Sequence, residues 1–133
     1  KYPGVLTLDV HTIENTPFFI VNKKITPIKV YHHKLPVFGF RIGDFAYITD
    51  AKTIANEEVK KLDNLEVLVI NALRLESHLS HFNLEEALAF IDRVKPKKAY
   101  LTHISHHMGF HDDVQKTLPE NVFLAYDELN ISL

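Results

Sequence analysis

The feature that most constrains the fold is a strand–helix–strand order in the second half of the chain. Residues 65–73 are almost continuously apolar, which is typical of a strand covered on both faces. Asn83 then precedes apolar residues at helical spacing, with Glu86 three positions later as a capping-box partner. Pro96 ends this helix, and residues 99–102 form the next apolar run. Two such strands joined through a helix predict a parallel, right-handed crossover unit.

The other predicted elements extend this unit on both sides. After it we expect a short helix around residues 112–118 and a last strand at 122–126. Before it, the first 50 residues contain short apolar runs typical of mostly antiparallel strands: 6–10, 18–21, 25–31, 36–42 and 45–49. Pro27 argues against a central position for its strand, because proline cannot donate to a sheet ladder. The predicted fold class is α/β with a mixed sheet, antiparallel strands first and then β-α-β-α-β.

Composition limits the classes of function. The 133 residues predict one domain, residues 1–133, and the absence of cysteine restricts any metal site to histidine and carboxylate ligands. The net charge of −2 gives no electrostatic footprint for nucleic acid, so a nucleic-acid partner is not expected. No apolar run approaches the roughly 20 residues of a membrane span, and residues 1–22 lack the order of a signal peptide. We therefore expect a cytoplasmic protein without a membrane partner.

Three potential metal ligands each directly follow a predicted strand. They are His32, Asp50 and His103. In open sheets flanked by helices, ligands collect outside the carboxyl ends of the strands. Two imidazoles and a carboxylate suit Zn, Mn or Fe, so the pattern predicts a metal site, although each residue alone is also compatible with a surface or capping role.

Several motifs, taken together, resemble one family. They are Thr-Pro-Ile-x-Val-x-His at 26–32, Gly-Phe-Arg at 39–41, Ile-Thr-Asp at 48–50 and Leu-Thr-His at 101–103. This pattern resembles the metallo-β-lactamase superfamily over residues 2–133. The closer likeness is to its phosphodiesterase branch, which includes phosphoribosyl cyclic phosphate diesterases and, more distantly, tRNA 3′-processing endonucleases. The resemblance implies the metallo-β-lactamase αβ/βα sandwich.

The resemblance also implies roles for individual residues. His32 would bind the first metal, Asp50 would bridge both metals, and His103 would bind the second. His81, within Ser-His-Phe-Asn-Leu-Glu-Glu, would contact the phosphate and protonate the leaving oxygen. The implied activity is hydrolysis of a small cyclic or nucleotide-like phosphate, assisted by two divalent ions, Zn or Mn.

Other histidines leave alternatives open. His33 competes with His32, which we prefer, because a one-residue shift along a strand moves the side chain to the opposite face. His78 competes with His81, which lies closer to the helix cap. We expect supporting, structural or solvent-facing roles for the remaining candidates: His11, His106, His107, His111 and Asp127.

The superfamily's defining segment, His-x-His-x-Asp-His, does not occur in the sequence. The resemblance places it upstream of Lys1, so we expect the C-terminal portion of the domain and half of its metal site. We therefore expect this chain alone to bind metal weakly and to be inactive. We also expect it to associate with the upstream half or with further copies of itself. The alternative functions are a non-catalytic scaffold and a nuclease similar to the tRNA 3′-processing enzymes.

Overall fold

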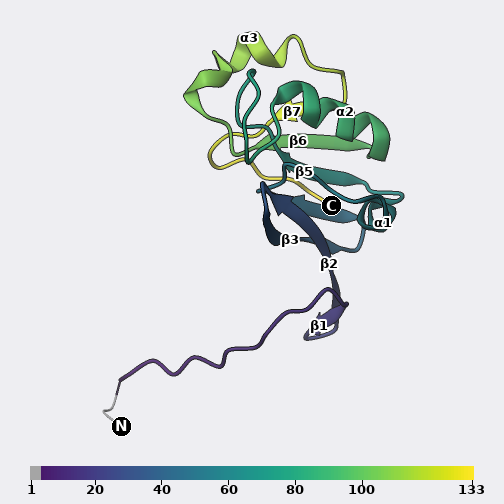
Figure 1. The fold of residues 1–133 in the computed structure, drawn as a ribbon, viewed down its shortest axis with the longest axis vertical. Coiled ribbons are helices and arrows are strands. Elements are labelled where there is room, and N and C mark those ends of the chain that lie inside the picture. The colour runs from purple at the N-terminus through teal and green to yellow at the C-terminus, as the bar shows by residue number, and fades with distance from the viewer. Residues whose placement is uncertain (1–3) are drawn as a thin grey trace.

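The computed structural model describes residues 4–133, apart from the side chain of His107. A seven-stranded sheet forms the body, and its spatial order follows the chain (Figure 1). Its strands are β1 (Phe18–Ile20), β2 (Lys23–His32), β3 (Leu35–Ile42), β4 (Phe45–Ile48), β5 (Val67–Asn71), β6 (Lys98–Thr102) and β7 (Val122–Leu124). The helices are α1 (Asn56–Val59), η1 (Lys60–Leu62), α2 (Leu84–Val94), η2 (His106–Met108) and α3 (His111–Gln115).

The strand directions match the predicted topology. Strands β1 to β4 pair antiparallel, whereas β4 to β7 pair parallel. Helix α2 connects β5 to β6, and α3 connects β6 to β7. The predicted mixed sheet, with antiparallel strands first and β-α-β-α-β after them, is confirmed. None of the helices in the described part of the chain is long and apolar enough to span a membrane.

Helix α2 begins and ends where the sequence predicts. The Asn83 side chain accepts a hydrogen bond from the Glu86 amide at 2.8 Å, and the Glu86 carboxylate accepts one from the Asn83 amide at 3.1 Å. Lys95 adopts a left-handed conformation (φ 56°) just before Pro96, which closes the helix. The inner face of the helix buries Ala87, Phe90 and Ile91 in the core, against strands such as β5, in which every residue is buried.

Pro27 lies where β2 has a strand on only one side. Strand β1 pairs with β2 only as far as Ile25, and Pro27 pairs with Phe40 of β3. Helices cover the other edge: the Lys61 ammonium donates to the Pro27 carbonyl at 3.0 Å, and the Lys29 amide donates to Glu58 at 2.9 Å. The prediction that Pro27 avoids a central position is therefore confirmed.

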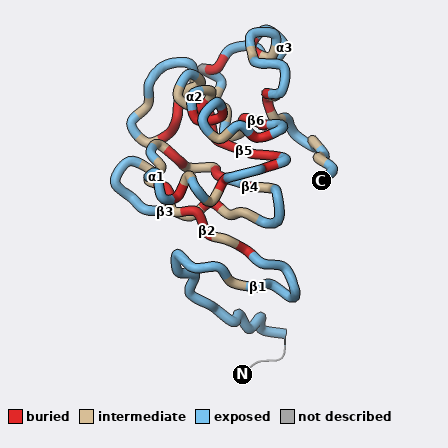
Figure 2. The backbone as a smooth tube through the Cα atoms, turned by 90° about the vertical axis from the view of Figure 1, so that its right-hand side faces the viewer, coloured by how far each residue is buried: buried red, intermediate tan, exposed pale blue. Residues whose placement is uncertain are grey.

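The predicted strand at residues 6–10 is wrong. These residues belong to an extended arm that leads away from the sheet before β1 (Figure 1). Leu6, Leu8 and Val10 are 88%, 80% and 87% exposed, and the whole arm is pale blue in Figure 2. The alternating pattern suits a strand, but no strand of the described chain runs beside the arm to complete a hydrogen-bonded ladder.

Candidate metal centre

The end of β2 and the residues after β4 lie side by side, which brings two predicted ligands together. His32 is the last residue of β2, and Asp50 follows β4 by two positions. The Lys52 amide donates to the Tyr31 carbonyl at 2.8 Å, and the Tyr31 amide donates to Thr53 at 2.9 Å. These backbone bonds place the segment that carries Asp50 next to the segment that carries His32.

Ala51 connects Asp50 to the segment that carries His81. Its carbonyl accepts a hydrogen bond from the Phe82 amide at 2.9 Å. The buried Asn71 side chain, at the end of β5, accepts from the Ala51 amide at 2.9 Å and donates to the Ala51 carbonyl at 2.8 Å. His81 and Asp50 are each adjacent to a residue of this network, so their spacing is set by backbone hydrogen bonds.

The turn after β6 is attached to the same region. The Ala72 amide donates to the Thr102 carbonyl at 3.0 Å, and the Ser105 amide donates to the Leu73 carbonyl at 2.8 Å. His103, the first residue after β6, lies between these two bonds and has a left-handed backbone (φ 59°). The chain exits of β5 and β6 thus bring His103 toward the other histidines.

The side chains of His32, Asp50 and His81 converge. One potential ligand atom from each lies within 4.8 Å of the other two, and His81 Nε2 is 3.4 Å from Asp50 Oδ1. The His32 and His81 ring centroids are 4.5 Å apart. The His103 ring stacks on His81 at 4.7 Å, and the His78 ring lies 5.4 Å from His81.

The chemistry of these groups fits a divalent metal. The Nδ1 atoms of His32 and His81 are buried without a hydrogen-bond partner among the described residues. Burial lowers the pKa of His81, and the neighbouring His103 and His32 reinforce the effect, although the hydrogen bond with Asp50 opposes it. A neutral imidazole is the form that binds metal, and imidazole with carboxylate suits Zn or Mn.

Of the two alternative histidines, His33 lies away from the cluster, whereas the His78 ring lies beside His81. His33 is exposed in the turn between β2 and β3, with φ 56°, whereas His32 faces the cluster. Burial lowers the pKa of His78, and the nearby Arg74, Lys52 and His32 side chains reinforce the effect. His11, His106 and His111 are exposed, and the side chain of His107 lies outside the described residues. Asp127 and His103 line one hollow of about 350 Å³.

Sequence reasoning missed two residues that hold the segments next to the cluster, Asn71 and Arg74. Asn71 interrupts the apolar run at 65–73 with a polar group, which was a visible signal for a side chain with a fixed partner. Arg74 follows the same run, and its carbonyl accepts a hydrogen bond from the Leu84 amide at 2.9 Å, at the start of α2. Neither residue belongs to a motif of the resemblance.

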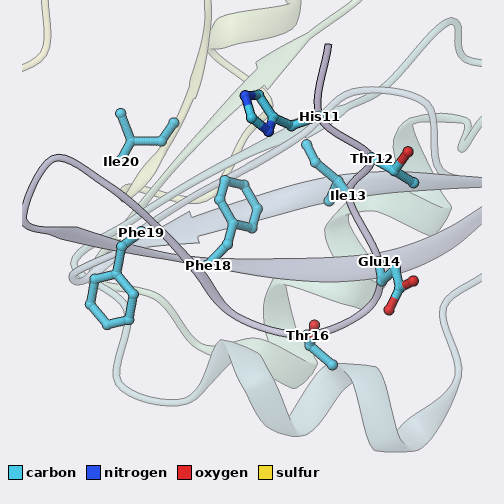
Figure 3. Close-up of a pocket in the computed structure, with 8 residues that line it drawn as sticks. All are labelled: His11, Thr12, Ile13, Glu14, Thr16, Phe18, Phe19 and Ile20. Carbon is cyan, nitrogen blue, oxygen red and sulfur yellow. The ribbon is translucent and has the colours of Figure 1, made fainter. Parts of the chain in front are cut away.

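A separate hollow lies between the arm and β1, away from the histidine cluster. It has a volume of about 560 Å³ and is lined mainly by the arm and by Phe18, Phe19 and Ile20 (Figure 3). Phe18 points into the concave side, whereas Phe19 points away from it. The lining offers one imidazole, His11, and one carboxylate, Glu14, so it lacks the convergent ligands of the cluster at His81.

Comparison with known proteins now identifies the family. Residues 3–104 match the model of the beta-lactamase superfamily domain. The chain therefore belongs to the beta-lactamase superfamily. It is 30% identical to a diphosphatase of the PhnP family, with a TM-score of 0.91 over 94% of this chain and 49% of that one. This match confirms the resemblance to the phosphodiesterase-like branch.

Other relatives share the fold or a segment. The human tRNase Z, short form, superposes with a TM-score of 0.67 at 19% identity, over 89% of this chain and 47% of that one. An octanoyltransferase from Porphyromonas gingivalis is 34% identical over 130 residues, which are 96% of this chain and 26% of that protein. The chain thus spans about a quarter of this curated relative and about half of the solved relatives above.

Proposed function

We propose that this chain carries half of the metal site of a dinuclear phosphodiesterase acting on a small cyclic or nucleotide-like phosphate. The observation that carries the proposal is the convergence of His32, Asp50 and His81 within 4.8 Å, with the His103 ring 4.7 Å from His81. Membership of the superfamily and the likeness to a PhnP-family diphosphatase support hydrolysis as the reaction class. The proposal includes a His-x-His-x-Asp-His segment on another stretch of polypeptide.

In this proposal His32, Asp50 and His103 hold the metals. Metal ions at such a site lower the pKa of a bound water and stabilise negative charge on the phosphate oxygens. Both oxygens of the Asp50 carboxylate have a neighbour: Thr49 Oγ1 donates to Oδ2 at 3.1 Å, and Oδ1 lies 3.4 Å from His81 Nε2. The backbone network at Ala51 keeps this carboxylate in place.

His81 has two possible roles that the geometry allows. It lies two residues before the Asn83 cap of α2, where the free amides of a helix start favour an anion. This position supports a role in contacting a phosphate and donating a proton to the leaving oxygen. Its distance from His32 and Asp50 would also suit a metal ligand. We propose the first role. The metal content of the His81→Ala variant distinguishes the two roles.

The name octanoyltransferase does not support a different activity for this chain. The match spans 26% of that protein, whereas the family model covers residues 3–104 of this one. The likeness to tRNase Z, at 19% identity, shows the fold alone, and the net charge of −2 gives no argument for an RNA substrate.

The first test compares two proteins with bis-p-nitrophenyl phosphate as substrate and added Zn or Mn. We expect the 133-residue chain to hydrolyse nothing measurable and to hold metal weakly, because catalytic zinc normally has three protein ligands at each ion. We expect the same chain preceded by its His-x-His-x-Asp-His half to be active. In that protein His32→Ala, Asp50→Ala and His103→Ala should abolish activity and reduce metal content, measured by emission spectrometry.

The control is His81→Ala, which should lower turnover and leave metal content nearly intact. Loss of metal in His81→Ala would reassign His81 as a ligand. Two tightly held metal equivalents in the 133-residue chain would contradict the half-site proposal. A metal-loaded longer protein that hydrolyses no phosphodiester would indicate the non-catalytic scaffold instead.

A further inference from the structure

The two segments that carry Asp50 and His81 are connected at successive positions. Asp50 Oδ1 lies 3.4 Å from His81 Nε2, and at the next position of each segment the Phe82 amide donates to the Ala51 carbonyl at 2.9 Å. The Phe82 carbonyl accepts from the Leu73 amide at 3.0 Å, which holds the same segment to the end of β5 but not to Asp50. Hydrogen-bond directions at a carbonyl oxygen vary widely, so these backbone bonds leave the direction of the His81 ring adjustable.

Lys52 makes a third connection, one position further along. Its ammonium contacts both carboxylate oxygens of Glu86 at 2.8 Å, and one of these oxygens also accepts from the Asn83 amide at 3.1 Å. Asn83 is the residue after Phe82, so the three connections follow one another along both segments. Lys52 is therefore linked through Glu86 to the cap of α2, two residues beyond His81.

The backbone of Lys52 is bound to the segment that carries His32. Its amide donates to the carbonyl of Tyr31, the residue before His32, at 2.8 Å. Lys52 thus contacts the segment of His32 with its backbone and the start of α2 with its side chain, and it follows Asp50 by two positions. A change in this side chain can therefore alter the distances between the three groups of the cluster.

The ion pair of Lys52 with Glu86 is better suited to orientation than to stability. The two side chains are 20% and 36% exposed, and ion pairs in contact with water contribute little to stability, because solvent screens them and two long side chains lose conformational freedom. Helix α2 also keeps a cap without Lys52, since the Asn83 side chain accepts from the Glu86 amide. The position of a catalytic group matters far more, because a misplacement of about 1 Å costs up to about a hundredfold in rate.

We propose that Lys52 is a positioning residue, whose ion pair with Glu86 holds His81 in place against Asp50 and His32. This inference rests on the proposed function, in which His81 contacts the phosphate and donates a proton to the leaving oxygen. Lys52 contacts no substrate in this role. It acts through Glu86 and the residues that follow His81.

The first measurement needs no catalysis and uses the 133-residue chain. The His81 ring centroid is 4.5 Å from that of His32 and 4.7 Å from that of His103, so nuclear Overhauser effects between their ring protons report the position of His81. We expect Lys52→Met to weaken or abolish these signals, and Glu86→Gln to do the same.

Two further variants separate the ion pair from a general loss of structure. Lys52→Arg should retain the signals, because a guanidinium can contact both carboxylate oxygens. The matched control is Lys97→Met, which breaks the 2.7 Å pair of Lys97 with Glu66 just before β6, at the strand end opposite His103. Glu86→Gln keeps an oxygen that can accept from the start of α2, so it tests the pair even where Lys52→Met does not fold.

Turnover separates positioning from a direct effect of charge on the substrate. In the longer protein proposed above, Lys52→Met and Glu86→Gln should each lower kcat about tenfold with little change in KM, and the double variant should lose no more than either alone. A lysine that attracted the phosphate by its charge would instead raise KM in Lys52→Met and leave kcat unchanged in Glu86→Gln.

Unchanged ring signals in Lys52→Met, equal losses in Lys97→Met, or additive losses in the double variant would overturn the role of Lys52. Loss of the ring signals together with a longer protein that hydrolyses no phosphodiester would support this role and refute the proposed function. Hydrolysis with the same kcat in Lys52→Met and Glu86→Gln would do the reverse.

Discussion

A single buried side-chain amide, Asn71, supports the two segments that carry Asp50 and His81. It is fully buried, and its oxygen and nitrogen both bond to the backbone of Ala51, which lies between Asp50 and the segment of His81. An apolar residue at this position would leave the Ala51 amide without its acceptor in the core. The residue thus contributes to stability and to the geometry of the cluster at once.

We expect Asn71→Ala to lower the free energy of unfolding by about 3 kcal/mol, through the unsatisfied backbone groups and the cavity. Urea unfolding followed by circular dichroism measures this change. Asn130→Ala is the control, because Asn130 is exposed and makes one bond to Glu128 at 3.3 Å. A loss in Asn71→Ala no larger than in the control would contradict the role given to Asn71.

At the scale of elements, a buried carboxylate connects the arm, β2 and α1. Glu58 accepts hydrogen bonds from Asn15 at 2.8 Å and from the Lys29 amide at 2.9 Å, and it pairs with Lys61 at 2.7 Å. Lys61 in turn donates to the side chain of Asn15 at 2.8 Å. Burial raises the pKa of Glu58, but the bonds from Lys61, Asn15 and Lys29 outweigh it and hold the pKa below its usual value.

This network predicts an acid-sensitive contribution to stability. The pKa of Glu58 is lower in the folded chain than in the unfolded chain, where it is about 4.5. The Glu58 carboxylate therefore stabilises the fold above pH 4.5, and this stabilisation is lost as the pH falls through the pKa of the folded chain. Glu58→Gln should lower the unfolding free energy by about 2 kcal/mol at pH 7, and the difference from the unmodified chain should shrink below about pH 4.5.

Urea titrations at a series of pH values measure this difference. Glu57→Gln, on an exposed residue of the same helix, should keep the stability and the pH slope of the unmodified chain. A difference between Glu58→Gln and the unmodified chain that stays constant down to pH 3 would refute the role of the Glu58 carboxylate.

At the scale of the whole molecule, the sheet is well covered at one end and open at the other. Helix α2 packs on the parallel strands, whereas most residues of the arm and β1 are exposed, as the pale blue of Figure 2 shows. Leu6, Leu8 and Val10 alternate along the extended arm, so they share one face that nothing in the described chain covers. An unpaired apolar edge of this kind favours association with another polypeptide.

We therefore propose that the 133-residue chain self-associates through the arm when no other segment covers it. Sedimentation velocity should show species larger than a monomer, and Leu6→Ser, Leu8→Ser and Val10→Ser combined should shift the distribution toward the monomer. Phe110→Ser is the control, since Phe110 is 82% exposed but lies far along the chain, beside α3. A stable monomer of the unmodified chain would contradict the proposal.

Much of the fold could be predicted from local signals. The buried run at 65–73, the capping pair Asn83 and Glu86, and the stop at Pro96 each act within a few residues, and each appears in the structure where the sequence indicates. The alternating run at 6–10 was the exception. A strand needs a neighbouring strand for its hydrogen bonds, and the sequence pattern of one segment does not say whether that neighbour is present.

The sequence by itself determined the order of the elements and the candidate ligands His32, Asp50, His81 and His103, through strand ends, a helix cap and family motifs. Only the tertiary structure decided their arrangement: His81 within 4.8 Å of His32 and Asp50, and His103 stacked on His81. It also revealed the supporting Asn71 and the ion pair of Lys52 with Glu86. These contacts join residues that are far apart in the chain, through backbone hydrogen bonds between different strands and loops. Periodicity and helix capping report only on residues close together in the sequence, so they carry no information about the distances between such residues.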